Sequence, residues 1–348
     1  MDPPPRPNDV ASQTKRQYLP LVLHQFRDLD PQFSYHFRVG DRTEPPRYTA
    51  SQLIPPEFVV QHIDPVYAAA HYAASHGMSI PYLCPAHTKR PGGDWETGVS
   101  GAEEELCRRS SLSASLNAAA SFYPLPGDGV VYSPHVVVFR EPADRYAPMA
   151  MDAWFVVPVM SVAPVRLPKL NASGSSGSSG EALRYSFAEE RAQSRQAMQA
   201  GLKAVLSQGY SAVVIGDFGL GRNGRNPPRV MAEMWRELFL YDPDIRGQFR
   251  TVVFAFASPD VSTEELIYEA AARAANKEAS KERRRKGGAY AGSASRSHAQ
   301  YEAAAGYGGM GSQRVTDFDI FQAMFHKAEI QRVLATKDPR YGLNMLTT

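Results

Sequence analysis

The chain has 348 residues, of which 43% are hydrophobic, and its 38 Lys and Arg nearly balance its 36 Asp and Glu to leave a net charge of +2. This balance gives no whole-chain argument for binding nucleic acid or a membrane surface. Two cysteines do not suggest a disulfide framework, and the nine histidines show no metal-ligand spacing. The N-terminus lacks the apolar core of a secretory signal, and no apolar run approaches the ~20 residues of a membrane helix. We therefore expect a protein of the cytoplasm, the nucleus or both, without a metal ion or a membrane partner.

The first quarter of the chain alternates Pro-rich segments with apolar ones. Residues 1–16 are Pro-rich and polar, which is typical of a disordered terminus. The apolar run in 18–26 predicts the start of a helix. Residues 58–76 place apolar side chains at mostly helical spacing and predict a helix that Pro65 kinks or restarts. A short apolar run at 79–86 predicts a buried strand.

Residues 89–112 combine a Pro-Gly-Gly turn with an acid-rich helix start. The helix is predicted over 102–120, and its first turn holds Glu103, Glu104 and Glu105. A strand followed by a Gly-rich loop and a helix N-terminus is a recurrent geometry for binding anions and sugars, because glycines let the backbone approach a ligand closely. The segment is therefore a candidate site, with an ordinary loop before an acid-rich first turn as the alternative.

The middle of the chain predicts two strands, a linker and a helix. β-Branched residues in 130–139 and the apolar run in 153–165 favour strands. The Gly/Ser tract at 171–182 predicts a flexible insertion. A helix is predicted over 186–207, and residues 186–189 fit a capping box at its start.

A second glycine loop, GLGRNGRN at 219–226, lies between a strand predicted over 212–218 and a helix. Asn226 is predicted to cap that helix, with Pro227 at its first position. A further buried strand is predicted over 251–257. Alternating helices and strands favour parallel pairing with right-handed crossovers.

The last quarter carries weaker signals. Residues 258–316 predict a mostly disordered insertion, in which 264–273 are compatible with a helix and 276–311 are polar, Gly/Ala/Ser-rich and in one part strongly charged. The basic run at 281–286 fits a nuclear import signal or a weak nucleic-acid contact, although a solvated charged segment is favoured. The amphipathic segment 317–340 predicts a closing helix that packs back on a domain spanning 17–257.

Residues 219–224 match the G-x-G-x-x-G pattern, whose backbone N–H groups can cradle a diphosphate. A dinucleotide site of the Rossmann type would need further strand–helix units downstream, where only one convincing strand follows. A protein kinase is excluded because no H-R-D loop or V-A-I-K strand precedes Asp217-Phe218-Gly219. The third interpretation joins both glycine loops in one site, with a diphosphate on the second loop and a sugar beside the acid-rich helix start.

Four segments together resemble the microbial-type poly(ADP-ribose) glycohydrolases: IPYLCPAHTKRPGG, PGGDWETGVSGAEEELCRRSSL, VYSPHVVVFR and GDFGLGRNGRNPP. The resemblance spans roughly residues 58–257 and extends to the closing helix. It implies a macrodomain-like α/β fold, with three layers, α/β/α, around a mixed, largely parallel central sheet. It also implies hydrolysis of the ribose–ribose O-glycosidic bond of poly(ADP-ribose), without a cofactor and with ADP-ribose as product. The partner of this monomeric enzyme would be poly(ADP-ribose) or an ADP-ribosylated protein.

The resemblance also implies which residues form the site. The downstream Leu-Cys-Arg sequence fixes the alignment, so that Glu104 matches the catalytic acid and Glu103 supports it by hydrogen-bonding ribose hydroxyls. Diphosphate binding falls to Gly219, Leu220, Gly221, Arg222, Asn223 and Gly224. The ribose side is formed by Cys84, Ala86, Gly92, Gly93, Asp94, Gly98, Val99 and Ala102. Three of these depart from the family pattern, since Asp94 replaces a glycine, Ala102 a glutamine and Cys84 an asparagine.

The implied chemistry needs one well-placed acid. Cleaving a glycosidic bond requires a proton on the leaving oxygen while an oxocarbenium-like centre develops. Glu104 would supply that proton and then activate water, so we expect it to be partly desolvated and close to another negative charge. A non-catalytic protein that binds ADP-ribose is the alternative, because of the three departures. Arg108 and Arg109 are expected to be solvated, and Cys84 and Cys107 to be small buried residues.

Overall fold

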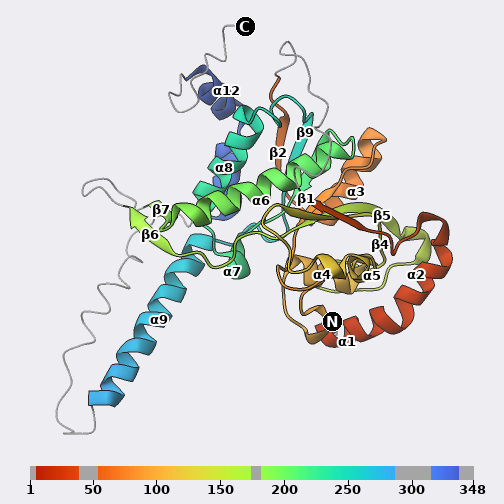
Figure 1. Cartoon of the computed structure of the whole chain (residues 1–348), viewed down its shortest axis with the longest axis horizontal. Coiled ribbons are helices and arrows are strands. Elements are labelled where there is room, and N and C mark those ends of the chain that lie inside the picture. Colours follow the sequence, from red (N-terminus) through yellow and green to blue (C-terminus); the bar gives the residue numbers. More distant parts are fainter. Residues whose placement is uncertain (1–4, 39–53, 174–181, 287–314, 337–348) are drawn as a thin grey trace.

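A seven-stranded sheet forms the centre of the computed structural model, which describes residues 5–38, 54–173, 182–286 and 315–336 (Figure 1). Its strand order is β1-β4-β5-β3-β8-β9-β2. Strand β4 is antiparallel to both of its neighbours, and the pairs from β5 to β2 are parallel. The predicted mixed, largely parallel sheet is thus confirmed. The strands are β1 (Tyr35–Arg38), β2 (Glu57–His62), β3 (Tyr82–Pro85), β4 (Gly129–Val138), β5 (Phe155–Val162), β8 (Ala212–Ile215) and β9 (Thr251–Phe256).

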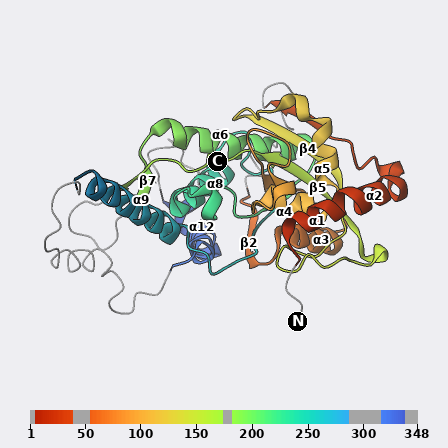
Figure 2. The same ribbon diagram turned by 90° about the horizontal axis from the view of Figure 1, so that it is seen from below.

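Helices cover both faces of this sheet, because its strands alternate their apolar side chains between two cores (Figures 1 and 2). Leu83 belongs to the core under α6, α8 and α11, whereas Tyr82 and Cys84 belong to the core under α3, α4 and α5. This arrangement confirms the three-layer α/β/α fold. The helices are α3 (Pro65–His76), α4 (Ala102–Arg109), α5 (Leu112–Ala118), α6 (Ala188–Ser207), α8 (Pro228–Tyr241) and α11 (Asp317–Met324).

Residues 58–76, predicted as one helix, instead form most of β2 followed by α3. Pro65 begins the helix, because the Asp64 carboxylate caps it by accepting from the N–H groups of Val66 and Tyr67 at 3.0 and 3.1 Å. The residues before this cap pair in parallel with β9. A capping carboxylate and a proline therefore separate two elements where the apolar spacing suggested one.

The helix predicted over 102–120 is divided into α4 and α5 at Ser110 and Ser111. Both hydroxyls make buried hydrogen bonds: Ser110 Oγ donates to Leu106 O at 2.6 Å, and Ser111 Oγ accepts from the Val137 N–H at 2.9 Å. These bonds offer the backbone an alternative to a continuous helix. The break leaves α4 as a short helix whose N-terminus carries the three glutamates.

Two predicted helix caps are absent. Ser186 Oγ donates to Asn171 Oδ1, so the predicted capping box at the start of α6 does not form. Asn226 does not cap α8, because its side-chain amide donates to Val165 O and Gly219 O, both at 2.7 Å. Asn226 therefore closes the second glycine loop instead of starting the helix.

The prediction of a disordered terminus over 1–16 is wrong for the described part of that segment. Helix α1 (Pro7–Gln13) leads through a π-helical turn into α2 (Leu19–Gln25), which confirms the helix start predicted in the following apolar run. Figure 1 shows α1 beside α4, and the buried Thr14 hydroxyl donates to the Arg108 carbonyl at 2.5 Å. Burial against α4 stabilises a segment whose Pro-rich composition gave no sign of packing.

The prediction of a mostly disordered insertion over 258–316 is wrong for its first half. Helix α9 (Thr263–Lys286) projects from the body of the domain (Figure 1). The basic run at 281–286 forms the end of α9, and 287–314 lies outside the described residues. Within the described ranges, no helix is long and apolar enough to cross a membrane.

Two further boundaries differ from the prediction. The closing helix expected over 317–340 is two helices, separated at Phe325 and His326, and its last residues lie outside the described part. The ends of the Gly/Ser tract 171–182 belong to an antiparallel hairpin, while its middle lies outside the described part. These elements are α12 (Lys327–Ala335), β6 (Leu170–Ser173) and β7 (Ala182–Tyr185).

Candidate functional site

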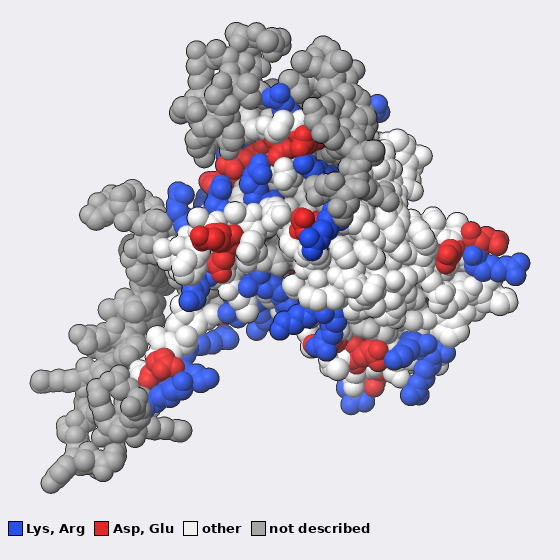
Figure 3. Space-filling model, viewed as in Figure 1, with Lys and Arg blue, Asp and Glu red and all other residues white. Residues whose placement is uncertain are grey.

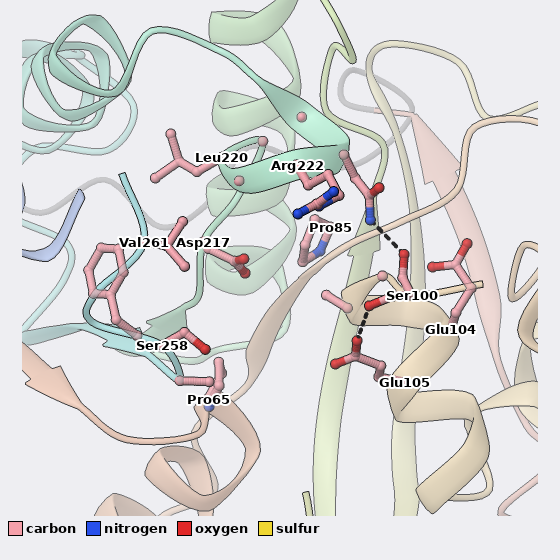
Figure 4. Close-up of a pocket in the computed structure, with 18 of the residues that line it drawn as sticks. Pro65, Pro85, Ser100, Glu104, Glu105, Asp217, Leu220, Arg222, Ser258 and Val261 are labelled. Carbon is pink, nitrogen blue, oxygen red and sulfur yellow. Dashed lines mark hydrogen bonds between the residues drawn. The ribbon is translucent and has the colours of Figure 1, made fainter. Parts of the chain in front are cut away.

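A cavity of about 630 Å³ opens at the carboxyl ends of the parallel strands β3, β8, β9 and β2. Loops that follow parallel strands meet at one edge of a sheet, so segments far apart in sequence line the cavity together. Figure 4 shows Ser100, Glu104 and Glu105 on one side of it and Ser258 and Val261 on the other. The second glycine loop lies between these two sides, where α7 (Gly221–Gly224) begins.

Glu104 lines the cavity from the first turn of α4 and is only 6% exposed. Two glycines make room for its carboxylate. A Cβ on Gly93 would lie 2.2 Å from Glu104 Oε1, and a Cβ on Gly101 would lie 2.3 Å from Oε2. The same Cβ on Gly101 would lie 3.5 Å from Asn223 Nδ2. The carboxylate and the second glycine loop therefore pack around one glycine, which brings the two sequence motifs into one site.

Glu103 does not line the cavity, contrary to the predicted contact with ribose. Its side chain is fully buried, and Oε2 accepts from the His87 N–H at 2.9 Å. Burial raises the pKa of Glu103 to about 8, although the His87 hydrogen bond opposes that shift and the neighbouring Glu104 adds to it. Glu103 is therefore an uncharged acid at neutral pH. Its hydrogen bond with the His87 N–H supports the loop after β3.

The predicted ribose side is only partly at the cavity. Ala86 and Ala102 line it. Cys84 is buried within β3, where burial raises the pKa of its thiol, and the Asp94 carboxylate pairs with Arg90 at 2.5 Å. Six of the eight predicted residues are absent from the lining of the cavity: Cys84, Gly92, Gly93, Asp94, Gly98 and Val99. Among them, Gly93 still shapes the site by contacting Glu104.

All six residues predicted to bind diphosphate line the cavity. Gly219 and Gly221 have positive φ angles of 73° and 68°, which glycine adopts without strain. A Cβ on Gly224 would lie 1.9 Å from Gly219 O, so the loop closes on itself only with glycine there. Asn223 Nδ2 donates to Ser100 O at 2.6 Å and ties this loop to the one that precedes α4 (Figure 4).

A buried hydrogen-bond relay supports the second glycine loop from behind. The Gly221 N–H donates to Thr263 Oγ1 at 2.7 Å, and that hydroxyl donates to Asp317 Oδ2 at 2.5 Å. Asp317 Oδ1 also accepts from the Thr263 N–H at 2.9 Å. The Gly221 N–H therefore already has a hydrogen-bond acceptor within the protein, and α9 and α11 together fix the position of the loop.

Sequence reasoning missed part of the cavity. Asp64, Asp217 and Ser258 line it, and each follows a parallel strand at the same sheet edge. Their position directly after a parallel strand was the signal from which sequence reasoning could have found them. Asp217 is exposed to the cavity yet surrounded by protein atoms, and this partial desolvation raises its pKa to about 6.

Both arginines of α4 are buried, contrary to the predicted solvated face. Arg108 is 1% exposed and donates to the carbonyl oxygens of Trp95 and Val99, so it fixes both ends of the segment between the glycine turn and α4. Arg109 is 3% exposed, lines the cavity and pairs with Asp64 through Nη2 and Oδ1 at 2.6 Å. Both arginines therefore anchor the last turn of α4, Arg108 to the segment before the helix and Arg109 to Asp64.

The fold and the cavity define a macrodomain-like α/β protein. The family described as "Microbial-type PARG, catalytic domain" matches residues 18–141, which include the Pro-Gly-Gly turn and Glu104. This match confirms, for that segment, the resemblance to the microbial-type poly(ADP-ribose) glycohydrolases. The comparison with curated proteins found no match.

Solved structures agree with this assignment of the fold. The poly(ADP-ribose) glycohydrolase of Thermomonospora curvata bound to the inhibitor ADP-HPD aligns with a TM-score of 0.53 at 24% identity, over 72% of this chain and 93% of that chain. A second structure of the glycohydrolase from that organism aligns with a TM-score of 0.50 at 22% identity, over 72% and 92% of the two chains. At this level of identity, the likeness establishes the fold.

Proposed function

We propose that this protein hydrolyses the ribose–ribose O-glycosidic bond of poly(ADP-ribose) and releases ADP-ribose. One observation supports the proposal above the others: the Glu104 carboxylate and the second glycine loop meet around Gly101 at the wall of one cavity. A substrate whose sugar is attached to a diphosphate requires both parts: an acid at the sugar and a loop that can bind the diphosphate. The match of residues 18–141 to the microbial-type catalytic domain agrees with it.

The cavity suits a single ADP-ribose unit. A volume of about 630 Å³ lies within the range of small-molecule and cofactor sites. The diphosphate would lie along residues 219–224, and the terminal ribose would face Glu104. The adenosine would then extend toward Asp217 and Ser258, at the opposite end of the cavity (Figure 4).

Glu104 would act first as a general acid and then as a general base. Its proton would pass to the leaving oxygen as the bond to the anomeric carbon breaks, and its carboxylate would then take a proton from the attacking water. The nearly complete burial of Glu104 limits competing solvent around the reacting oxygen. Glu103, uncharged below about pH 8, would position the loop beneath Glu104 without adding a second negative charge.

A non-catalytic ADP-ribose reader is the second candidate. It is favoured by Ala102, whose methyl group lines the cavity where the resemblance implies a glutamine amide. Losing that amide removes a hydrogen-bonding group from the ribose side but leaves the second glycine loop intact. Both candidates predict binding of ADP-ribose, and only the first predicts turnover.

The test compares the parent protein with Glu104→Gln on poly(ADP-ribose) and on mono-ADP-ribosylated protein. Release of ADP-ribose by the parent and a loss of at least ~100-fold in the variant are expected, since a positioned acid contributes about 10²–10⁴-fold. Glu105→Gln is the matched control, because Glu105 is the adjacent carboxylate and its Oε1 already accepts from Ser100 Oγ. Binding of ADP-ribose without release by the parent would support the reader, and absence of binding would reject both candidates.

A further inference from the structure

Basic side chains gather at the Glu104 end of the cavity. Figure 3 shows Lys and Arg side chains clustered between α7 and α4 on this face of the molecule. Arg166 is exposed and lines the cavity, and Arg90 is exposed in the turn that leads to Gly93. His87 also lines the cavity; burial lowers its pKa, Glu104 opposes that shift, and Arg166 and Arg90 add to it. We call Arg90 and Arg166 the basic rim.

The charges of the basic rim are only partly neutralised. Arg166 Nε donates to Asn223 O at 3.3 Å, and no carboxylate pairs with Arg166 in the part of the chain that the structure describes. Arg90 pairs with Asp94, but 59% of its side chain remains exposed to solvent. Besides the Asp94 carboxylate, the Glu104 carboxylate lies near His87. The two guanidinium groups therefore give this edge positive charge.

The basic rim lies on the side of the cavity where a leaving group would emerge. Under the proposed function, the terminal ADP-ribose has its diphosphate on 219–224 and its ribose at Glu104. The glycosidic bond at that ribose therefore directs the next unit of the chain past Glu104, away from Asp217 and Ser258. A second ADP-ribose unit brings another diphosphate, and exposed arginines bind phosphate oxygens in a bidentate manner.

We infer that the basic rim, Arg90 and Arg166, binds the diphosphate of the ADP-ribose unit that precedes the scissile bond. This inference rests on the proposed placement of the terminal unit. A protein side chain that carries one ADP-ribose offers no diphosphate on the leaving side. The rim would therefore lower the Kd for oligomers without changing the Kd for ADP-ribose, and this advantage would weaken with salt.

The test measures binding in the Glu104→Gln background, which prevents turnover. The probes are ADP-ribose and an ADP-ribose dimer, titrated by calorimetry at two salt concentrations. Adding Arg90→Gln and Arg166→Gln is expected to raise the Kd of the dimer roughly five- to tenfold at low salt and that of ADP-ribose less than twofold. The matched control replaces Arg27 and Arg273 by Gln, which removes the same charge from exposed sites outside the cavity lining.

Each outcome decides the inference. Equal changes for both probes would mean that the rim serves the terminal unit, and no change for either would mean that the rim binds neither; both results overturn it. An increase with the control pair as large as that with the rim pair would show only long-range attraction and overturn it as well. Turnover by the parent is measured separately. If the parent does not hydrolyse poly(ADP-ribose) but the rim variants still lose affinity for the dimer, the proposed reaction is refuted and the inference about the rim stands.

Discussion

The Glu104 carboxylate and the Gly93 backbone lie so close that no side chain fits between them, since a Cβ on Gly93 would be 2.2 Å from Glu104 Oε1. Gly93 also has a φ of 55°, a left-handed conformation that side chains with a Cβ rarely adopt. The Pro-Gly-Gly turn therefore has a defined role: it sets the position of the carboxylate on α4.

Gly93→Ala is expected to lower the rate of ADP-ribose release by about 100-fold, because displacing a catalytic group by ~1 Å can cost that much. The rate of release from poly(ADP-ribose) measures it, with thermal unfolding as a check on folding. Gly77→Ala is the matched control, since Gly77 has a φ of 65° but nothing within 4 Å of an added Cβ. An equal loss of rate in the control would attribute the effect to backbone strain rather than to the carboxylate.

Asp317→Ala is expected to weaken ADP-ribose binding by about tenfold, because it removes both acceptors that fix Thr263 behind Gly221. Leaving a buried donor without a partner costs about 1–3 kcal/mol, which corresponds to a change in Kd of roughly 5- to 160-fold. Calorimetric titration with ADP-ribose measures the effect. Asp319→Ala is the control in the same helix turn, since Asp319 caps α11 through Thr316 and does not contact the relay. A similar weakening in both variants would reject the relay as the cause.

Glu103 gives the protein a pH-dependent stability. Its pKa is raised to about 8 in the folded state, so the folded protein holds a proton that the unfolded chain releases above about pH 4.5. Stability from this group therefore falls as pH rises from about 4.5 to 8, by up to ~1.4 kcal/mol per pH unit. Asp217 and Asp317 have pKa values raised to about 6, so the pH dependence of stability that they cause lies mainly below pH 6, outside the window from pH 6 to 8.

Glu103→Gln is accordingly expected to flatten the pH dependence of the free energy of unfolding between pH 6 and 8. Glutamine keeps the oxygen that accepts from the His87 N–H but has no proton to lose. Denaturant unfolding of the parent and the variant at several pH values measures the difference in slope. Parallel curves over that window would contradict a raised pKa for the Glu103 carboxyl.

The strands that form the site edge were predictable because each carries a short apolar run that ends at a glycine or polar loop. The predicted strands at 79–86, 212–218 and 251–257 contain β3, β8 and β9, and the loops after them line the cavity. The strand β2 was not predictable in the same way, since its apolar spacing continues into α3 and suggests one helix. Only Asp64 and Pro65 mark the boundary, through a cap that depends on the three-dimensional position of the carboxylate.

The sequence by itself determined the two glycine loops, the three consecutive glutamates and the parallel pairing of the strands around the second loop, because these depend on local backbone chemistry and apolar patterning. The tertiary structure decided which glutamates face the cavity. Successive residues on a helix point in different directions, so packing under the loop after β3 buries Glu103 and leaves Glu104 and Glu105 at the wall. Packing also buried Arg108 and Arg109 and made the N-terminal segment helical, since distant segments supply their partners: Trp95 and Val99, Asp64, and α4.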